Sequence, residues 1–261
     1  MRKYLFLITF IILLSQPMFG WGNLGHAIVA KIAERHLTPK AKKNIEKYFD
    51  GKSIIYYASW MDFYRRTPEY KQTSIWHEAP CDNSFYHTDT VAWKDGDAVS
   101  ALKAAIDTLS NYHNLNDSTV AANIRYIVHL MGDMHCPCHI KYPGIFTYYK
   151  IKIKGVEYPY HSVWDSYIIE HYRSWSYTEW QENLDRKSDK EIQTIVAGDV
   201  DEWFHKSAVY CQYIYKMVPE NTELNEIQSL DFLNKAIVIA EHQLLDAGYR
   251  LSYVLNKIFE K

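Results

Sequence analysis

The stretch HLMGDMHCPCH, which begins at His129, gathers imidazole, carboxylate and thiol groups within eleven positions. His129 and Asp133 are four residues apart, and His161 and Asp165 repeat that spacing. Residues four apart on a helix lie on one face, with Cβ atoms about 5–6 Å apart, and imidazole and carboxylate are usual ligands of zinc. One such pair alone is more often a surface ion pair. Two pairs, with His139 between them, favour a metal site.

Cys136 and Cys138 in the same stretch raise other chemistries. Haem attachment and a thioredoxin-like motif both need two residues between the cysteines, whereas here Pro137 stands alone between them. A thiolate zinc site is open as an alternative, although an oxidising compartment outside the cytoplasm favours disulfides. One intervening residue is too few for an unstrained bridge within the pair. We therefore expect structural cysteines with disulfide partners in Cys81 and Cys211, in either pairing.

Further donors lie upstream in the segment ASWMDFYRRTPEYKQTSIWHEAP. It supplies Asp62, an arginine three residues later at Arg65, and His77 fifteen residues after Asp62. They add a carboxylate, a guanidinium and an imidazole to the candidate site residues.

The first twenty residues carry two cations, then an apolar run, then a glycine. This is the pattern of a signal peptide, and the run is too short to span a bilayer as a helix. Cleavage after residue 20 leaves residues 21–261, beginning WGNLGH, in a periplasm or outside the cell. The new amino group of Trp21 and its backbone carbonyl could then chelate a metal beside His26.

The composition limits which classes of binding partner are expected. The formal net charge is −2, and both signs are mixed along the chain, so no basic stripe indicates duplex nucleic acid or an anionic membrane. The 22 tyrosines and 8 tryptophans exceed what a core needs. Exposed rings could stack on bases or sugars, with packing between helices as the alternative for any single ring.

Apolar residues recur at spacings of three and four through most of the chain, which predicts helices. Thr38 followed by Pro39 predicts a helix start, and Asp117 or Ser118 is the expected cap of a later helix. Only residues 146–160 alternate with period two, with a hairpin turn at Lys154-Gly155. We expect a mainly α, single-domain fold with a small β-hairpin. The predicted helices cover 23–37, 38–49, 97–112, 117–135, 161–172 and 231–259.

In their order and spacing, these pieces resemble the secreted zinc-dependent single-strand-specific nucleases, the family of the fungal nucleases S-one and P-one, related to bacterial phospholipases C. The resemblance covers most of the mature chain. It takes in WGNLGH, ASWMD, WH, RYIVHLMGDMHCPCH, YHSVWD and AGYRLSYVLN. It implies a helical phospholipase C/nuclease-like fold and three buried zinc ions in a monomer that binds single-stranded nucleic acid or nucleotides.

The resemblance also assigns ligands by matching positions. The first zinc would be held by Asp62, His77, His129 and Asp133. The second, close to it, would be held by Trp21, His26 and the bridging Asp133. The third would be held by His139, His161 and Asp165. Few protein donors per ion leave open positions for water and substrate, as a catalytic site requires.

The implied reaction is hydrolysis of phosphodiester bonds in single-stranded DNA and RNA to 5′-phosphate ends, with 3′-nucleotidase activity on short products. Asp62 would orient the attacking water or accept its proton. Arg65 would pair with a phosphoryl oxygen.

The chain departs from the family after His77. The fungal enzymes have an aromatic residue there that stacks on a base, and here Glu78 follows. An anionic side chain neither stacks nor attracts phosphate, so the base preference stays open. Aromatic substitutes are Tyr64, Trp76 or Phe85.

Three further residues near the predicted ligands are assigned roles other than metal binding. His87 is a rival to His77, but the spacing from Asp62 favours His77. His135 is a candidate donor to one of the ligands rather than a ligand, and Trp164 is expected to serve packing.

Two other functions compete. A phospholipase C would use the same zinc cluster on a phospholipid head group, but the charge balance and the lack of an amphipathic interfacial helix argue against it. A secreted zinc-binding protein with an inactive cluster is the second, and the presence of Asp62 and Arg65 argues against it.

Overall fold

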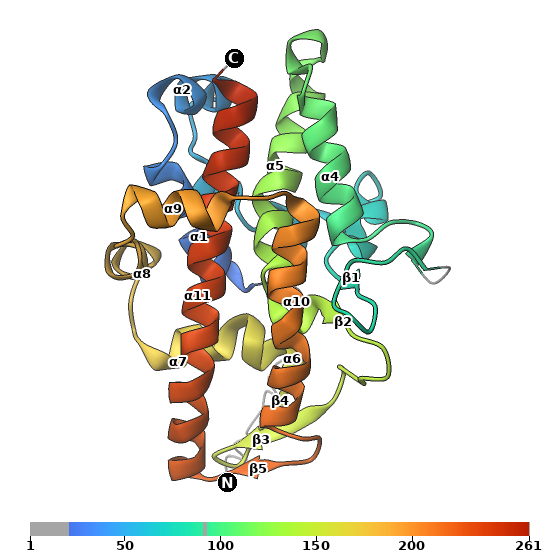
Figure 1. Cartoon of the computed structure of the whole chain (residues 1–261), viewed down its shortest axis with the longest axis vertical. Coiled ribbons are helices and arrows are strands. Elements are labelled where there is room, and N and C mark those ends of the chain that lie inside the picture. Colours follow the sequence, from blue (N-terminus) through green and yellow to red (C-terminus); the bar gives the residue numbers. More distant parts are fainter. Residues whose placement is uncertain (1–20, 91–92, 261) are drawn as a thin grey trace, which may run out of the picture.

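The computed structural model describes residues 21–90 and 93–260, so the predicted signal peptide and its cleavage position lie outside the described residues. Two pairs of helices form the centre, with α1 packed on α11 and α4 packed on α5. Helix α10 contacts one helix of each pair, α11 and α4 (Figure 1). These long helices are α1 (Asn23–Arg35), α4 (Ala98–Leu109), α5 (Asp117–Met134), α10 (Val200–Met217) and α11 (Glu226–Phe259).

Short elements connect and flank this centre. The short α-helices are α2 (Pro39–Lys47), α3 (Trp60–Tyr64), α6 (Tyr160–Ser162), α7 (Ile168–Tyr172), α8 (Tyr177–Leu184) and α9 (Asp189–Val196). The single turns of 3-10 helix are η1 (Ile54–Tyr57), η2 (Lys71–Ile75), η4 (Tyr112–Asn114) and η5 (Pro137–His139). A π-helical turn, η6 (Val163–Tyr167), joins α6 to α7. The strands are β1 (Ala79–Pro80), β2 (Ile140–Lys141), β3 (Lys150–Ile153), β4 (Val156–Pro159) and β5 (Glu223–Leu224). The mainly α, single-domain prediction is therefore confirmed.

Helix starts follow their capping residues. Thr38 caps α2 as predicted, its side chain accepting from Ala41 N, with Pro39 in the first turn. The cap of α5 is Asn116, whose side-chain oxygen accepts from Thr119 N at 2.8 Å, so the predicted cap at Asp117 or Ser118 is wrong. Asparagine caps as well as aspartate does, and from the first turn Asp117 still faces the positive end of the helix dipole.

The predicted hairpin is confirmed. β3 and β4 pair antiparallel, ending at Ile153 opposite Val156. Lys154 and Gly155 both have positive φ, 51° and 79°, as a two-residue turn of type I′ requires. An unpredicted third strand, β5, pairs parallel with β3 over two residues.

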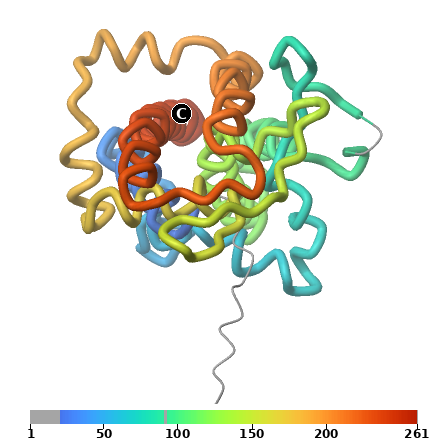
Figure 2. Tube along the Cα trace, turned by 90° about the horizontal axis from the view of Figure 1, so that it is seen from below, coloured from blue at the N-terminus to red at the C-terminus, as the bar shows by residue number. Residues whose placement is uncertain are grey.

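Among the described residues, four α-helices lie where the sequence analysis predicts none: α3, α8, α9 and α10. Both α8 and α9 begin with a capping box, formed by Ser176 with Glu179 and by Ser188 with Glu191, and this explains their start points. The segment that carries them passes around the side of α11 (Figure 2) and packs on α1 and α11. None of the helices in the described part of the chain combines the length and apolarity needed to span a bilayer.

The close packing of α1 on α11 depends on Gly248. A Cβ there would lie 2.5 Å from Ile32 Cγ2 and 2.6 Å from Ile32 Cβ, and the latter atom cannot rotate away. We expect Gly248→Ala to lower the free energy of unfolding, because overpacking costs about 1–3 kcal/mol and exceeds the roughly 1 kcal/mol that alanine gains in a helix. Denaturant unfolding measures this. Val238→Ala on the exposed face of α11 is the control, with a change within about 0.5 kcal/mol; equal stability of both variants would contradict the packing.

Candidate metal centre

Four elements distant in sequence deliver side chains to one buried point. In the last two turns of α5, His129 and Asp133 face α1, which contributes His26. Asp62 comes from α3 and His77 from the residues before β1. Of these side chains, the three imidazoles and Asp133 are almost fully buried. The fold thus brings these five predicted residues close together.

Asp133 lies at the middle of this group with its two oxygens facing different partners. Oδ1 is 3.3 Å from His26 Nε2, whereas Oδ2 is 2.9 Å from His77 Nδ1 and 3.2 Å from His129 Nε2. A carboxylate whose oxygens face two separate imidazole sets has the arrangement of a bridging ligand.

Asp62 closes the side of the group that reaches solvent. Its oxygens lie 3.8 Å from His77 Nδ1 and 3.9 Å from His129 Nε2. Arg65, one turn later, places Nη2 3.9 Å from Asp62 Oδ1. The Asp62 side chain is 17% exposed, whereas that of Asp133 is 0% exposed, so Asp62 is the carboxylate that an entering molecule would meet.

Backbone carbonyls fix two of the rings. A carbonyl oxygen only accepts, so His129 Nδ1 donates to Ala58 O at 2.8 Å and His139 Nδ1 donates to the carbonyl of His77. Each ring therefore turns its other nitrogen, Nε2, to the cluster, and this is the nitrogen left to bind a metal. The parallel pairing of β1 with β2, at Ala79 and Ile140, holds the His77 and His139 backbones side by side.

A second carboxylate collects the remaining predicted ligands. His139 Nε2 lies 3.2 Å from Asp165 Oδ1, and His161 Nε2 lies 3.3 Å from Asp165 Oδ2. The helix predicted over 161–172 contains the π-turn η6 at this point, and Asp165 is within it. π-turns occur often at functional sites.

Trp21 and His26 reach the centre through close approaches of the chain. Gly22 N donates to the backbone oxygen of Asp165 at 2.8 Å, so the preceding residue Trp21 is held close to the Asp165 backbone. A Cβ at Gly132 would be 2.8 Å from His26 Nδ1. Glycine at that position lets the His26 ring lie against α5, stacked on His129 with ring centroids 3.9 Å apart.

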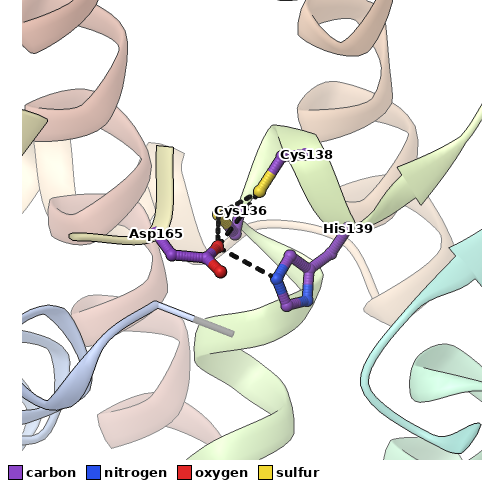
Figure 3. Close-up of side chains that lie close together, drawn as sticks. All are labelled: Cys136, Cys138, His139 and Asp165. Carbon is purple, nitrogen blue, oxygen red and sulfur yellow. Dashed lines mark hydrogen bonds and ion pairs between the residues drawn. The ribbon is translucent and has the colours of Figure 1, made fainter. Parts of the chain in front are cut away.

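Cys136 and Cys138 lie next to Asp165 (Figure 3) and not against Cys81 and Cys211, where disulfides were expected. All four are thiols. Cys136 Sγ is 3.3 Å from Cys138 Sγ, and Cys81 is hydrogen-bonded to Cys211. The predicted bridges between the two pairs are therefore wrong, because the 3-10 turn η5 points the sulfur atoms of Cys136 and Cys138 to one side.

Burial and charge set the protonation of the centre. Burial, with His129 beside it, lowers the pKa of His26 to about 4, so this ring is neutral. Burial alone would lower the pKa of His129, but the Asp133 and Asp62 carboxylates outweigh it and raise that pKa to about 9. Burial, together with the Cys138 thiol, raises the pKa of Asp165 well above its usual range. Without cations the cluster thus retains protons, which a bound metal would displace.

Several polar atoms of the cluster lack hydrogen bonds. Among the described residues these include Asp133 Oδ1, Asp165 Oδ2 and His26 Nε2. An unsatisfied buried polar atom costs about 1–3 kcal/mol, and a buried carboxylate needs a positive partner. Divalent cations would satisfy oxygens and nitrogen together, so the residues fit a metal centre.

Contacts in the structure decide the roles of His87 and His135. His87 Nε2 pairs with Asp97 at 3.0 Å, at the start of α4, so His77 and not His87 joins the cluster. His135 Nδ1 donates to Met131 O, and its Nε2 accepts from Arg250 at 2.6 Å. The expectation that His135 donates to a ligand is therefore wrong, because its ring at the end of α5 turns to α11. Trp164 is fully buried, as packing requires.

Sequence reasoning missed the group formed at Glu78. Its carboxylate accepts from the Tyr148 hydroxyl at 2.8 Å and pairs with Lys141 Nζ at 2.7 Å. The Tyr148 ring is 54% exposed and lies nearly parallel to the His161 ring, with centroids 6.2 Å apart. The Lys141 ammonium group thus balances the charge of Glu78, and Glu78 positions the Tyr148 ring beside the centre. The Glu78–Tyr148 contact joins residues 70 positions apart, so no local pattern predicts it.

Comparison with known proteins identifies a family for this chain. The profile of the S1/P1 Nuclease family matches residues 21–260. Endonuclease 3 of Arabidopsis thaliana is 24% identical over 281 residues, covering 97% of this chain and 94% of that protein. Nuclease S1 of Aspergillus oryzae (strain ATCC 42149 / RIB 40) is 23% identical over 282 residues, covering 94% of each. Nuclease P1 of Penicillium citrinum is 29% identical over 157 residues, covering 57% of this chain and 58% of that protein. With its whole described length matched, the chain belongs to the S1/P1 nuclease family.

Proposed function

We propose that this protein is an exported zinc enzyme that cleaves phosphodiester bonds in single-stranded DNA and RNA, leaves 5′-phosphate ends and acts on short products as a 3′-nucleotidase. Membership of a nuclease family supports the phosphodiesterase reaction. The twenty residues before the family match have the signal-peptide pattern, which supports export of residues 21–261. We expect the exported chain to act as a monomer.

One observation carries the proposal: Asp133 presents one oxygen to His26 and the other to His77 and His129. Two neighbouring cations bridged by one carboxylate are the arrangement that phosphoester hydrolysis uses. The donor sets follow. The first ion would be held by Asp62, His77, His129 and Asp133. The second would be held by Asp133, His26 and Trp21. The third would be held by His139, His161 and Asp165.

Bound there, zinc would supply Lewis-acid charge that acidifies water and offsets phosphate charge. The chain itself provides the proton acceptor and the positioning groups. Asp62 is the carboxylate open to solvent, and it would orient the attacking water and accept its proton. Arg65, held one turn away, would pair with a phosphoryl oxygen and keep the phosphorus in line with that water.

Exposed rings around Asp62 support a single-stranded substrate. Phe63 and Tyr64, directly after Asp62, are 64% and 44% exposed, and Tyr148 lies beside His161. Aromatic faces stack on unpaired bases of any sequence. These rings would stack on bases in place of the aromatic residue that the fungal enzymes have at the position of Glu78.

The test uses denatured DNA and phosphatidylcholine as alternative substrates, each with and without chelator. We expect hydrolysis of the DNA that chelator abolishes and zinc restores. Chelator-sensitive hydrolysis of the lipid alone would assign the protein to phospholipase C chemistry. Zinc binding without either activity would identify a metal-binding protein and overturn the proposal.

The role of Trp21 gives a separate prediction. A mature protein that keeps one extra residue before Trp21 should bind less zinc, because its terminal amine becomes an amide that cannot ligate. Zinc per chain and the rate on denatured DNA should both fall relative to protein that begins at Trp21. Equal zinc content and rate in the two forms would show that the terminus is not a ligand.

A further inference from the structure

Two sulfur atoms share a carboxylate oxygen with a predicted zinc ligand. Asp165 Oδ1 lies 3.1 Å from Cys138 Sγ, 3.7 Å from Cys136 Sγ and 3.2 Å from His139 Nε2. The two thiols and the imidazole all point to that oxygen (Figure 3). These four donor atoms lie within 4.8 Å of one another, and all four residues are buried.

We propose that Cys136 and Cys138 are metal ligands, so that the ion held by His139 and Asp165 has sulfur donors as well as nitrogen and oxygen. This inference rests on the proposed function, since it concerns the third of its ions, and it changes the donor set of that ion. The His161 ring faces the other oxygen, Asp165 Oδ2. The sulfur atoms therefore add to the predicted ligands and do not displace His161.

The distances fit a single ion. With His161 the ion has five protein donors, and zinc bonds of about 2.3 Å to sulfur and about 2.0–2.1 Å to nitrogen and oxygen give a five-coordinate shell with edges of about 2.9–4.0 Å between adjacent donors. The separations of 3.1, 3.2 and 3.7 Å from Asp165 Oδ1 to its three neighbours agree with those edges. The 3.3 Å between Cys136 Sγ and Cys138 Sγ is close to them as well. The four groups thus already have the spacing of one coordination shell.

The backbone holds this spacing in place. Cys136 precedes the 3-10 turn η5, and Pro137 begins that turn with a fixed φ. The Tyr215 hydroxyl of α10 donates to the backbone oxygen of Cys138 at 3.2 Å. Both thiols are 0% exposed. The pair is therefore positioned by the fold and shielded from bulk oxidants.

Coordination requires no redox partner. Each S–H bond breaks, its proton leaves to solvent, and the thiolate donates an electron pair to the cation. The sulfur is neither oxidised nor reduced. Thiolate donors favour zinc and other soft ions over magnesium or manganese, so we expect the third ion to resist exchange by those two cations and to be replaced by cadmium.

The other cysteine pair serves as a matched control. Cys81 and Cys211 are also buried and in contact with each other. Among the described residues, neither belongs to a group of potential metal donors.

The experiment is zinc K-edge X-ray absorption on the metal-loaded full-length mature protein. We expect a zinc–sulfur shell at about 2.3 Å beside the nitrogen and oxygen shell at about 2.0–2.1 Å. The Cys136→Ser/Cys138→Ser variant should lose the sulfur shell, and the Cys81→Ser/Cys211→Ser variant should keep it. Cobalt-substituted protein should show a sulfur-to-cobalt charge-transfer band with the same dependence on the variants.

Either of two results would overturn the proposal without any variant: a shell of nitrogen and oxygen only in the wild-type protein, or a Cys136–Cys138 disulfide in peptide maps of the zinc-loaded form. Hydrolysis of denatured DNA is assayed on the same samples. Chelator-sensitive cleavage without a sulfur shell would refute the sulfur ligands alone, whereas absence of both zinc and cleavage would refute the proposed function itself.

Discussion

Asp133→Ala is expected to remove two metal ions per chain and to abolish hydrolysis of denatured DNA. Asp133 supplies one oxygen toward His26 and the other toward His77 and His129. Its loss leaves three imidazoles with only Asp62 as a nearby anion. Removing a group that merely orients a ligand costs about 10–100-fold, so loss of a shared ligand should cost the rate more than about 100-fold.

Elemental analysis of zinc per chain, together with the rate at saturating zinc, measures this effect. Asp107→Ala on the exposed side of α4 is the matched control and should keep full metal content and activity. A metal count that falls by one ion or by none in Asp133→Ala would show that this carboxylate does not bridge.

Asp62→Asn is expected to lower kcat by about 10²–10⁴-fold, the usual contribution of a proton acceptor. The amide has the size of the carboxylate but cannot take the proton of the attacking water. Asp133, His77 and His129 remain to hold the first ion, and the amide oxygen can still face it, so the variant should retain most of its metal. The change should therefore appear in kcat at full zinc occupancy and much less in KM.

Glu69→Gln, an exposed carboxylate just after the same helix, controls for loss of negative charge near the substrate. Its kcat should match that of the wild-type protein. An Asp62→Asn enzyme with unchanged kcat and full zinc content would remove Asp62 from the reaction and leave it as a ligand only.

Local patterns predicted the parts of the fold that are local in origin. The spacing of His129 and Asp133 on a regular helix was sufficient to place them together, and Lys154-Gly155 was sufficient to define a hairpin. Strand β5 could not be predicted, because two residues at Glu223–Leu224 carry no periodicity. Its pairing with β3 depends on contacts far along the chain.

In the site, too, the features missed from the sequence depend on contacts between distant parts of the chain. His26 and Asp62 were placed by resemblance to a family, since nothing in their own neighbourhood indicates that they approach α5. The partners of Glu78 were missed, because its contacts with Lys141 and Tyr148 depend on how two loops fold over the centre. The cysteine pairing failed for a related reason. Spacing limits which bridges can form, but it does not show which way the side chains of η5 turn.

The π-turn η6 allows the continuous helix of α6, η6 and α7 to face the metal centre at one end and the apolar interior at the other. It contains one residue more than a regular turn, so the surface presented by α6 and the surface presented by α7 are rotated relative to each other. Before the turn, His161 faces the candidate metal centre; after it, Ile168 and Ile169 are buried in the apolar interior. Deleting a single residue here would restore regular winding and rotate one half by about 100°. Either catalysis or packing would then be lost, so this helix tolerates substitution better than any change of length.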